Sequence, residues 1–231
     1  MKNILWDIDG TLLNFDLAET AALNKCFEIF NLNQPDDKMV KNYKKINDSY
    51  WKKLERNEIT REEVLVGRFE EFFRDYGIDV DLASRFNYNF QVELGKTYIF
   101  NPHGDELVRK FFGVYDQYAV TNGSLIAQRG KLEGSGLNKL FKKSFISELV
   151  GFEKPDKRFF DHVFKEIGSN NLEDYVIIGD SLTSDMLGGI NANIKTIWYN
   201  PECIENYLDI PIDREIRSLK EVEKVLGEIF I

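Results

Sequence analysis

The sequence is poor in cysteine and histidine and has no long hydrophobic run. It contains two cysteines and two histidines in 231 residues, whereas a small secreted protein held together by disulfides would carry more cysteine. No apolar stretch approaches the roughly 20 residues of a membrane-spanning helix, and Asp7 interrupts the N-terminus too early for the apolar core of a secretory leader. We therefore expect a cytoplasmic protein without a membrane partner.

Positive charge is also scarce. The chain has 30 Lys and Arg residues against 39 Asp and Glu residues, which gives a net charge of −9 and an isoelectric point of about 4.9. Binding to a nucleic-acid polymer needs clustered positive charge, so we expect no such partner. A small anion remains compatible with this composition, because one lysine and one metal ion can reverse the potential inside a pocket.

Short β-prone runs alternate with amphipathic stretches over much of the chain. The runs, each ending at a polar residue or glycine, are residues 4–6, 118–120, 176–178 and 196–199. The stretches with helical spacing of apolar residues are 104–112, 125–135, 157–167, 184–192 and 218–230. Continuous apolar runs of this length are typical of strands buried on both faces of a parallel sheet. The alternation predicts an α/β fold with a Rossmann-like, doubly wound parallel sheet, in which ligands bind at the carboxyl ends of the strands.

The segment from residue 16 to residue 99 interrupts this alternation. Its apolar residues recur with helical spacing, and it has almost no strand signal. The length of the chain suits one large domain, or one domain with a smaller companion. We expect residues 1–15 and 100–231 to form the α/β core, and residues 16–99 to form an inserted helical domain.

Two acidic residues, Asp7 and Asp9, directly follow the first β-prone run and precede Gly10. In an extended chain these two side chains point to the same side, and Gly10 permits a sharp turn after them. Two close carboxylates repel each other unless a cation lies between them or one holds a proton. The pattern favours a Mg²⁺ site combined with a nucleophile and a general acid. The alternative is a turn in which Asp and Gly only cap the next element.

A second acidic pair, Asp180 and Asp185, follows the run at 176–178, and Asp180 is expected to reach the same sheet edge as Asp7. Asp185 would lie in or just behind a metal site, but Ser184 or Asp185 could equally be the N-cap of the next helix.

Thr121 and Asn122 follow another strand and offer a hydroxyl, an amide and main-chain N–H groups to a phosphate oxygen, although alone they are a turn signature. Lys154 would neutralise a phosphoryl group if it lies at the strand ends, whereas a lone lysine is usually a solvated surface charge.

This order of residues resembles the haloacid dehalogenase-like (HAD) hydrolase superfamily over nearly the whole chain. Four motifs carry the resemblance: Asp-x-Asp-x-Thr at Asp7 to Thr11, a strand-end Thr121, Lys154-Pro155, and the acidic pair Asp180 and Asp185. The resemblance implies a Rossmann-like core with an α-helical cap inserted after the first motif. One departure is the linker Asn101-Pro102-His103-Gly104, where many relatives have Pro-Gly, and we expect it to have no clear consequence.

The resemblance also implies a mechanism. Asp7 would attack phosphorus to form an aspartyl-phosphate, and Asp9 would protonate the leaving oxygen and then deprotonate the attacking water. The implied cofactor is Mg²⁺, and its implied ligands are Asp7, the main-chain carbonyl of Asp9, Asp180 and, in support, Asp185. Thr121, Asn122 and Lys154 are the expected phosphate-binding residues. Members that resemble true dehalogenases lack a carboxylate at the position of Asp9, so its presence favours phosphoryl transfer over dehalogenation.

At a finer level the chain is similar to the bacterial pyrimidine 5′-nucleotidases, which act on dUMP, UMP and dTMP. The similar stretches in the cap are residues 47–51, 59–63 and 67–69, and those in the core are residues 121–123, 132–137, 146–148, 151–155, 179–181, 184–192 and 198–201. Within the cap, Trp51 could stack on a base and Arg68 could reach a phosphate or carbonyl, although core packing for Trp51 and a helix ion pair for Arg68 are the simpler readings.

Three other functions remain open at this level. They are a HAD phosphatase for phosphoglycolate or a sugar phosphate, a sugar phosphomutase, and a catalytically silent nucleotide-binding module. We expect a small phosphorylated substrate and a monomer or homodimer.

Overall fold

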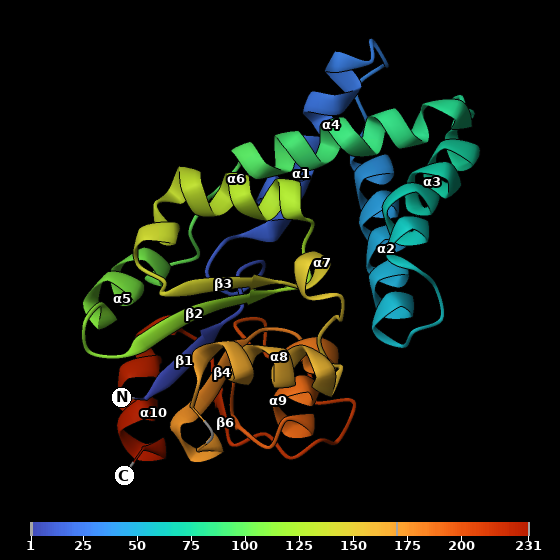
Figure 1. Cartoon of the computed structure of the whole chain (residues 1–231). Coiled ribbons are helices and arrows are strands. Elements are labelled where there is room, and N and C mark those ends of the chain that lie inside the picture. The colour runs from blue at the N-terminus through green and yellow to red at the C-terminus, as the bar shows by residue number, and fades with distance from the viewer. Residues whose placement is uncertain (1, 170, 231) are drawn as a thin grey trace.

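The computed structural model in Figure 1 describes residues 2–169 and 171–230. Within these residues, six parallel strands form one sheet in the order β3-β2-β1-β4-β5-β6. The strands are β1 (Asn3–Trp6), β2 (Asp116–Thr121), β3 (Lys143–Ile146), β4 (Tyr175–Gly179), β5 (Lys195–Tyr199) and β6 (Arg214–Ile216). Because β1 pairs with β2 on one side and β4 on the other, the strand order reverses at β1. Ligand sites of doubly wound sheets lie at such a reversal, beyond the carboxyl ends of the strands.

The central strands are buried on both faces. Every residue of β1 and β4 is buried, and Ile4 and Trp6 join one apolar cluster while Leu5 joins the other. This alternation is the period of two that a strand imposes. The four sequence-predicted strands and the predicted fold class are confirmed, but the edge strands β3 and β6 were missed.

Helices cover both faces of the sheet (Figure 1). These helices are α5 (Gly104–Phe111), α6 (Leu125–Ser135), α7 (Ser147–Val150), α8 (Lys157–Ile167), α9 (Leu187–Asn191) and α10 (Val222–Ile229). Leu107 of α5, Leu132 of α6 and Leu226 of α10 pack on one face, and Phe160 of α8 packs on the other. The short connecting turns are η3 (Leu137–Lys139), η4 (Leu172–Asp174), the π-helical turn η5 (Leu182–Met186) and η6 (Leu219–Glu221).

The chain between β1 and α5 forms a helical region with its own apolar core. It comprises α1 (Phe15–Ile29), α2 (Asp37–Glu55), the π-helical turn η1 (Glu63–Gly67), α3 (Arg68–Tyr76), η2 (Val80–Leu82) and α4 (Ala83–Lys96). Aromatic rings fill this core, with Phe69 stacked on Tyr43 and packed against Phe86 and Phe90. The helical character predicted for this segment is therefore confirmed, and its many phenylalanines serve packing.

The helical region contacts the rest of the molecule along α6, which lies next to α4 in Figure 1. A Cβ atom on Gly130 of α6 would lie 2.7 Å from the carbonyl oxygen of Gly95 in α4, so the two backbones approach closely only because both residues are glycine. Ala127 of α6 belongs to the apolar core of the helical region. The same helix thus packs on the sheet and supports the helical region.

Two connecting segments join the helical region to the sheet, and they run side by side. Leu13 forms an antiparallel bridge with Phe100, the Asn14 N–H donates to the Ile99 carbonyl at 2.7 Å, and the Asn101 N–H donates to the Leu12 carbonyl at 2.9 Å. The chain therefore leaves and re-enters the sheet at one place. Among the described helices, none combines the length and the apolar character that crossing a bilayer requires.

Candidate active site

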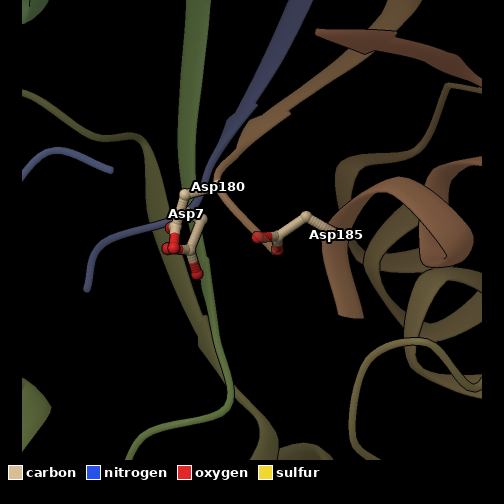
Figure 2. Close-up of side chains that lie close together, drawn as sticks. All are labelled: Asp7, Asp180 and Asp185. Atoms are coloured by element: carbon tan, nitrogen blue, oxygen red, sulfur yellow. The ribbon is translucent and has the colours of Figure 1, made fainter. Parts of the chain in front are cut away.

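Three carboxylates meet at the carboxyl edge of the sheet. Asp7 follows β1, Asp180 follows β4, and Asp185 lies in η5. Each offers an oxygen atom within 4.8 Å of the other two, and Figure 2 shows the carboxyl groups of Asp7 and Asp180 side by side with that of Asp185 turned toward them. The strand ends thus bring together residues that lie far apart in the sequence, as expected.

Lys154 lies inside this cluster and is 1% exposed. Its Nζ atom donates to Asp7 Oδ1 at 2.7 Å, to Asp185 Oδ1 at 2.6 Å and to the Val120 carbonyl at 2.9 Å. It is therefore not a solvated surface charge. Burial opposes its charged form, but the two carboxylates outweigh that effect and raise the pKa of Lys154 above its ordinary value.

The carboxylates carry more negative charge than one lysine balances. Burial, together with the negative charges of Asp185 and Asp180, raises the pKa of Asp7 well above its ordinary value although Lys154 opposes the shift. Burial and Asp185 raise the pKa of Asp180 to about 7. A divalent cation would relieve this repulsion. Carboxylate oxygens are the ligands that Mg²⁺ prefers, so the residues at this edge fit the expected metal.

The carboxylate of Asp9 is not part of this cluster. It accepts hydrogen bonds from Lys131 Nζ at 2.5 Å and from Gln128 Nε2 at 2.7 Å, and both donors lie fully buried on α6. Asp9 and Gln128 also line the cavity described below. The sequence interpretation missed Lys131 and Gln128, because nothing in a helical stretch more than 100 residues away marks them as partners of Asp9.

The turn after Asp9 depends on glycine and on the second connecting segment. Gly10 has a φ of +93°, and a Cβ atom there would lie 2.5 Å from Asp180 Oδ2, so a side chain is excluded. The Thr11 hydroxyl donates to Asp180 Oδ1 at 2.7 Å. The Asn101 side chain donates to the carbonyls of Gly10 and Thr11 at 2.8 and 2.9 Å. The expectation that the Asn101 linker has no consequence was therefore wrong, since its amide holds the loop that carries Asp7 and Asp9.

Asp185 is held from behind by the turn that precedes it. Its Oδ2 atom accepts the Ser181 N–H at 3.1 Å, and a Cβ atom on Gly179 would lie 2.3 Å from its Cγ atom. Ser181 is the N-cap, since its side chain accepts the Ser184 N–H. The alternative is therefore wrong, since neither Ser184 nor Asp185 is the N-cap of this turn.

Thr121 and Asn122 lie at the end of β2, and both line the same cavity. The Thr121 hydroxyl accepts the Gly123 N–H at 3.0 Å. The Asn122 side chain pairs with both main-chain groups of Lys154, donating to its carbonyl at 2.8 Å and accepting its N–H at 2.9 Å. The Asn122 side chain thus fixes the position of the Lys154 main chain.

A cavity separates these sheet residues from the helical region. The sheet side of its lining includes Asp7, Asp9, Thr121, Lys154, Asp180 and Asp185. The helical region contributes Phe15, Trp51, Glu55, Arg68, Gln91 and Leu94. A ligand in this cavity would therefore meet carboxylates and a lysine on one wall, and aromatic, apolar and polar side chains on the other.

Trp51 and Arg68 are joined through one amide. The Asn47 Oδ1 atom accepts from Trp51 Nε1 at 3.1 Å and from Arg68 Nη1 at 2.5 Å. Arg68 is 2% exposed and lies over the rings of Phe69 and Phe90. It makes no ion pair with an acid of its own helix among the described residues, so that simpler reading does not hold. Both side chains line the cavity.

Glu55 is a cavity residue that the sequence interpretation missed. It ends α2, and burial raises the pKa of its carboxyl to about 7 although Thr183 opposes the shift. Its Oε2 atom is buried and has no hydrogen-bond partner among the residues that the structure describes. A carboxyl group of this kind can donate or accept a hydrogen bond near neutral pH.

Glu19 is a buried acid that contacts the Asn47 amide, and its burial leads to a prediction for stability. Asn47 Nδ2 donates to it at 2.7 Å, and burial raises its pKa from 4.5 to about 7 although Arg68 opposes the shift. Between these two values the folded protein retains a proton that the unfolded chain has released, so stability falls as the pH rises through this window. We expect Glu19→Gln to raise the free energy of unfolding by about 3 kcal/mol at pH 8 and by less than about 1 kcal/mol at pH 5.

Urea unfolding at the two pH values measures this difference. Glu28→Gln is the control, since Glu28 is exposed on the same helix, and it should change stability little at either pH. An equal gain from Glu19→Gln at pH 5 and pH 8 would show that the shift of its pKa is absent.

The sheet is doubly wound, and it carries a carboxylate cluster and a buried lysine where the strand order reverses. This combination of fold and site points to a class of hydrolases. The sequence model of the haloacid dehalogenase-like hydrolases matches residues 1–193. The chain therefore belongs to the haloacid dehalogenase-like hydrolases, as the sequence motifs implied.

Full-length relatives include HAD-hydrolases and nucleotidases. The HAD-hydrolase YfnB of Bacillus subtilis is 38% identical over 98% of this chain and 95% of its own length. The pyrimidine 5′-nucleotidase PynA of Streptococcus pneumoniae is 36% identical over 96% and 93%. The pyrimidine 5′-nucleotidase YjjG of Escherichia coli is 28% identical over 96% of both chains. A crystal structure of YfnB, described as bound to magnesium and as revealing interdomain movement, superposes with a TM-score of 0.92 at 35% identity over 98% of both chains.

Proposed function

We propose that this protein is a Mg²⁺-dependent phosphomonoester hydrolase, and that its substrates are pyrimidine nucleoside monophosphates such as dUMP, UMP and dTMP. The observation that carries the reaction type is the cavity in which Asp7 and Asp9, on one loop, face Lys154 and the carboxylates of Asp180 and Asp185. Support for the substrate class comes from PynA and YjjG, which are pyrimidine 5′-nucleotidases similar to this chain over nearly its whole length.

The proposed reaction has two displacements at phosphorus. In the first, a carboxylate oxygen of Asp7 forms a bond to phosphorus while the bond to the leaving oxygen breaks, and Asp9 gives that oxygen a proton. In the second, Asp9 takes a proton from water as the water oxygen attacks phosphorus, which releases inorganic phosphate and restores Asp7. Lys131 and Gln128 hold the Asp9 carboxylate between these steps.

Charge is managed by Lys154 and the carboxylate cluster. Lys154 would bind a phosphoryl oxygen, with Thr121 and the Asn122 loop as further donors. Mg²⁺ would be held by Asp7, Asp180, the main-chain carbonyl of Asp9 and, in support, Asp185, and it would neutralise charge on the transferred group. Unaided phosphomonoester hydrolysis is so slow that accelerations of up to about 10²¹ are needed, which one hydrogen bond cannot supply.

In this proposal residues 16–99 act as a cap over the core formed by residues 1–15 and 100–231. The two connecting segments, at residues 13–16 and 99–104, lie side by side and would serve as the hinge. The interdomain movement described for YfnB supports a mobile cap. Closure would exclude water from the phosphorylated intermediate until the leaving group has departed.

Substrate selection is assigned to the cap wall. The indole of Trp51 offers a face on which a base can stack, and the Arg68 guanidinium offers donors to a base carbonyl. Pyrimidines carry such carbonyls. The net charge of −9 disfavours a nucleic-acid polymer, and the partner that we propose is a soluble phosphorylated metabolite of the cytoplasm.

The test of this proposal is phosphate release with Mg²⁺ across dUMP, UMP, dTMP, CMP, AMP, GMP, phosphoglycolate and several sugar phosphates. We expect the pyrimidine monophosphates to be turned over fastest, and EDTA to abolish release. Trp51→Leu should raise KM for the best nucleotide by about tenfold, since base stacking contributes about 1–3 kcal/mol.

Other results of the substrate panel would distinguish between the alternative functions. If a sugar phosphate or phosphoglycolate is fastest, the reaction type stands and the substrate class is wrong. No turnover of any compound would favour a nucleotide-binding module. Tyr88→Leu is a matched control for Trp51→Leu, because Tyr88 is an exposed aromatic residue of the same helical region, and it should leave KM unchanged.

A further inference from the structure

Arg61 joins the helical region to three loops of the sheet at once. It lies between α2 and η1, and its side chain is 15% exposed. Its Nη2 atom donates to Glu153 Oε1 at 3.1 Å and to the Asn122 carbonyl at 3.1 Å, and also to the Ser147 hydroxyl. These acceptors follow β2, begin α7 and precede Lys154. A planar guanidinium can serve several fixed acceptors in this way, whereas an ammonium is a flexible point charge.

The loops that Arg61 contacts are those that position the buried lysine. Glu153 is the neighbour of Lys154 in the chain, and the Asn122 side chain holds both main-chain groups of Lys154. Within the described residues, no other side chain of the helical region forms an ion pair with the sheet part. A change in the position of Arg61 would therefore act on Asn122 and Lys154 together.

On its other side Arg61 reaches the wall of the cavity. Its guanidinium carbon lies 5.7 Å from the centre of the Trp51 ring, and Trp51 shares the Asn47 amide with Arg68. The contacts continue from Arg68 to Asn87 at 3.1 Å, from Asn87 to Gln91 at 3.1 Å, and from Gln91 to Ser124 at 2.6 Å. The network thus starts at Asn122, crosses the cavity-facing side of the helical region, and returns to the same loop two residues later.

We propose that Arg61 is a positioning residue. It couples the position of the cap, and of any leaving group held against Trp51, to the position of the loops that carry Asn122 and Lys154. The inference rests on the proposed function for the roles of those two residues toward phosphate. It adds that a displaced cap leaves the phosphate-binding loops without one of their supports. Low activity toward phosphomonoesters that do not seat the cap follows from this coupling.

The chain offers a matched control for Arg61. Arg56 lies five residues earlier on the same connection and pairs with Glu58. Both side chains are about half exposed, and within the residues that the structure describes neither forms a hydrogen bond or an ion pair with the sheet part. Arg56→Gln therefore removes the same charge from the same segment without touching the loops. An exposed pair of this kind contributes little to stability.

The experiment compares Arg61→Gln, Arg61→Lys, Arg56→Gln, Glu153→Ala and the double variant Arg61→Gln/Glu153→Ala. The readouts are kcat and KM for whichever phosphomonoester the wild type turns over fastest, and the affinity for inorganic phosphate with Mg²⁺, measured by calorimetry. We expect Arg61→Gln to lower kcat/KM and phosphate affinity by about tenfold, which is within the range of coupling between contacting residues. Arg61→Lys should recover less than half of the loss, and Arg56→Gln should match the wild type.

The double variant separates coupling from simple packing. If Arg61 acts through the Glu153 loop, the double variant loses no more activity than Arg61→Gln alone. The inference is overturned if the two losses multiply, if Arg61→Gln matches Arg56→Gln, or if Arg61→Gln only lowers Tm while phosphate affinity stays unchanged. Should Arg61→Gln not fold, Arg61→Lys and Glu153→Ala carry the same comparison. These measurements do not require a nucleotide substrate, so a non-nucleotide preference would overturn the proposed substrate class and leave this coupling standing.

Discussion

Asp7→Asn is expected to lower kcat by at least about 10⁴-fold while the protein remains folded, because an amide nitrogen or oxygen does not replace the carboxylate nucleophile. The substitution should not cost stability. Asp7 is buried beside Asp180 and Asp185, and its raised pKa shows that its charge is disfavoured there. In the absence of Mg²⁺ we therefore expect Tm to stay equal or to rise. Steady-state phosphate release and a thermal scan measure the two effects.

Asp161→Asn is the control for the loss of kcat in Asp7→Asn. Asp161→Asn removes a half-exposed carboxylate on α8 that pairs only with Lys157 among the described residues, and it should leave kcat unchanged. If Asp7→Asn keeps more than a few per cent of the wild-type rate, Asp7 is not the nucleophile. A nucleotide-binding module would lose little function in this variant, so the same experiment separates an enzyme from a sensor.

Lys154→Met should damage both activity and stability. It removes the one cation found between Asp7 and Asp185 in the described residues, and breaking a buried ion pair from one side costs about 3–5 kcal/mol. We expect kcat/KM to fall by at least about 10³-fold, because the developing charge on the phosphoryl group loses its preorganised donor. Denaturant unfolding without metal should show the loss of stability. Adding Mg²⁺ at about 100 times its Kd should restore up to about 2.7 kcal/mol.

Lys157→Met is the comparison for this prediction, since Lys157 lies three residues away and is 55% exposed. This substitution should change the free energy of unfolding by less than about 1 kcal/mol. It should leave kcat/KM unchanged. Lys154→Met with wild-type stability in metal-free buffer would mean that the three carboxylates do not need a cation. That result would contradict the electrostatic account of the site.

The centre of the fold could be predicted from the sequence because its strands are buried on both faces. Continuous apolar runs such as residues 176–178 leave few alternatives to a parallel strand. The edge strands carry no such signal: β3 begins with exposed Lys143, and β6 begins with two exposed residues, Arg214 and Glu215. An edge strand needs only one apolar face, so its pattern is short and easily lost among loops.

The same distinction applies to the site. Asp7 and Asp180 were predicted because each directly follows a buried strand, and Lys154 was predicted from the Lys154-Pro155 motif; the structure brings the three together. The partners of Asp9 on α6, the Asn101 amide behind the turn and the contacts of Arg61 were not predicted. Each of these depends on how a helix or linker packs against a distant loop, and residue types such as Lys131 or Gln128 in a helix are ordinary. Only the tertiary structure shows that they are buried and face a carboxylate.

In the proposed mechanism the phosphoryl group is transferred first to the Asp7 carboxylate and then to water. Asp9→Asn, which lacks the base for the second step, can be mixed with radiolabelled acetyl phosphate, whose leaving group needs no acid, and quenched in acid. Reduction with tritiated borohydride displaces the phosphate and converts a phosphorylated aspartate to tritiated homoserine, and peptide mapping then locates this tritium label. We expect the label on residue 7, formed in the presence of Mg²⁺ and absent when Asp7→Asn is added to the variant. Phosphate release by the wild type without a covalent label in Asp9→Asn, or a label on another residue, would contradict this account.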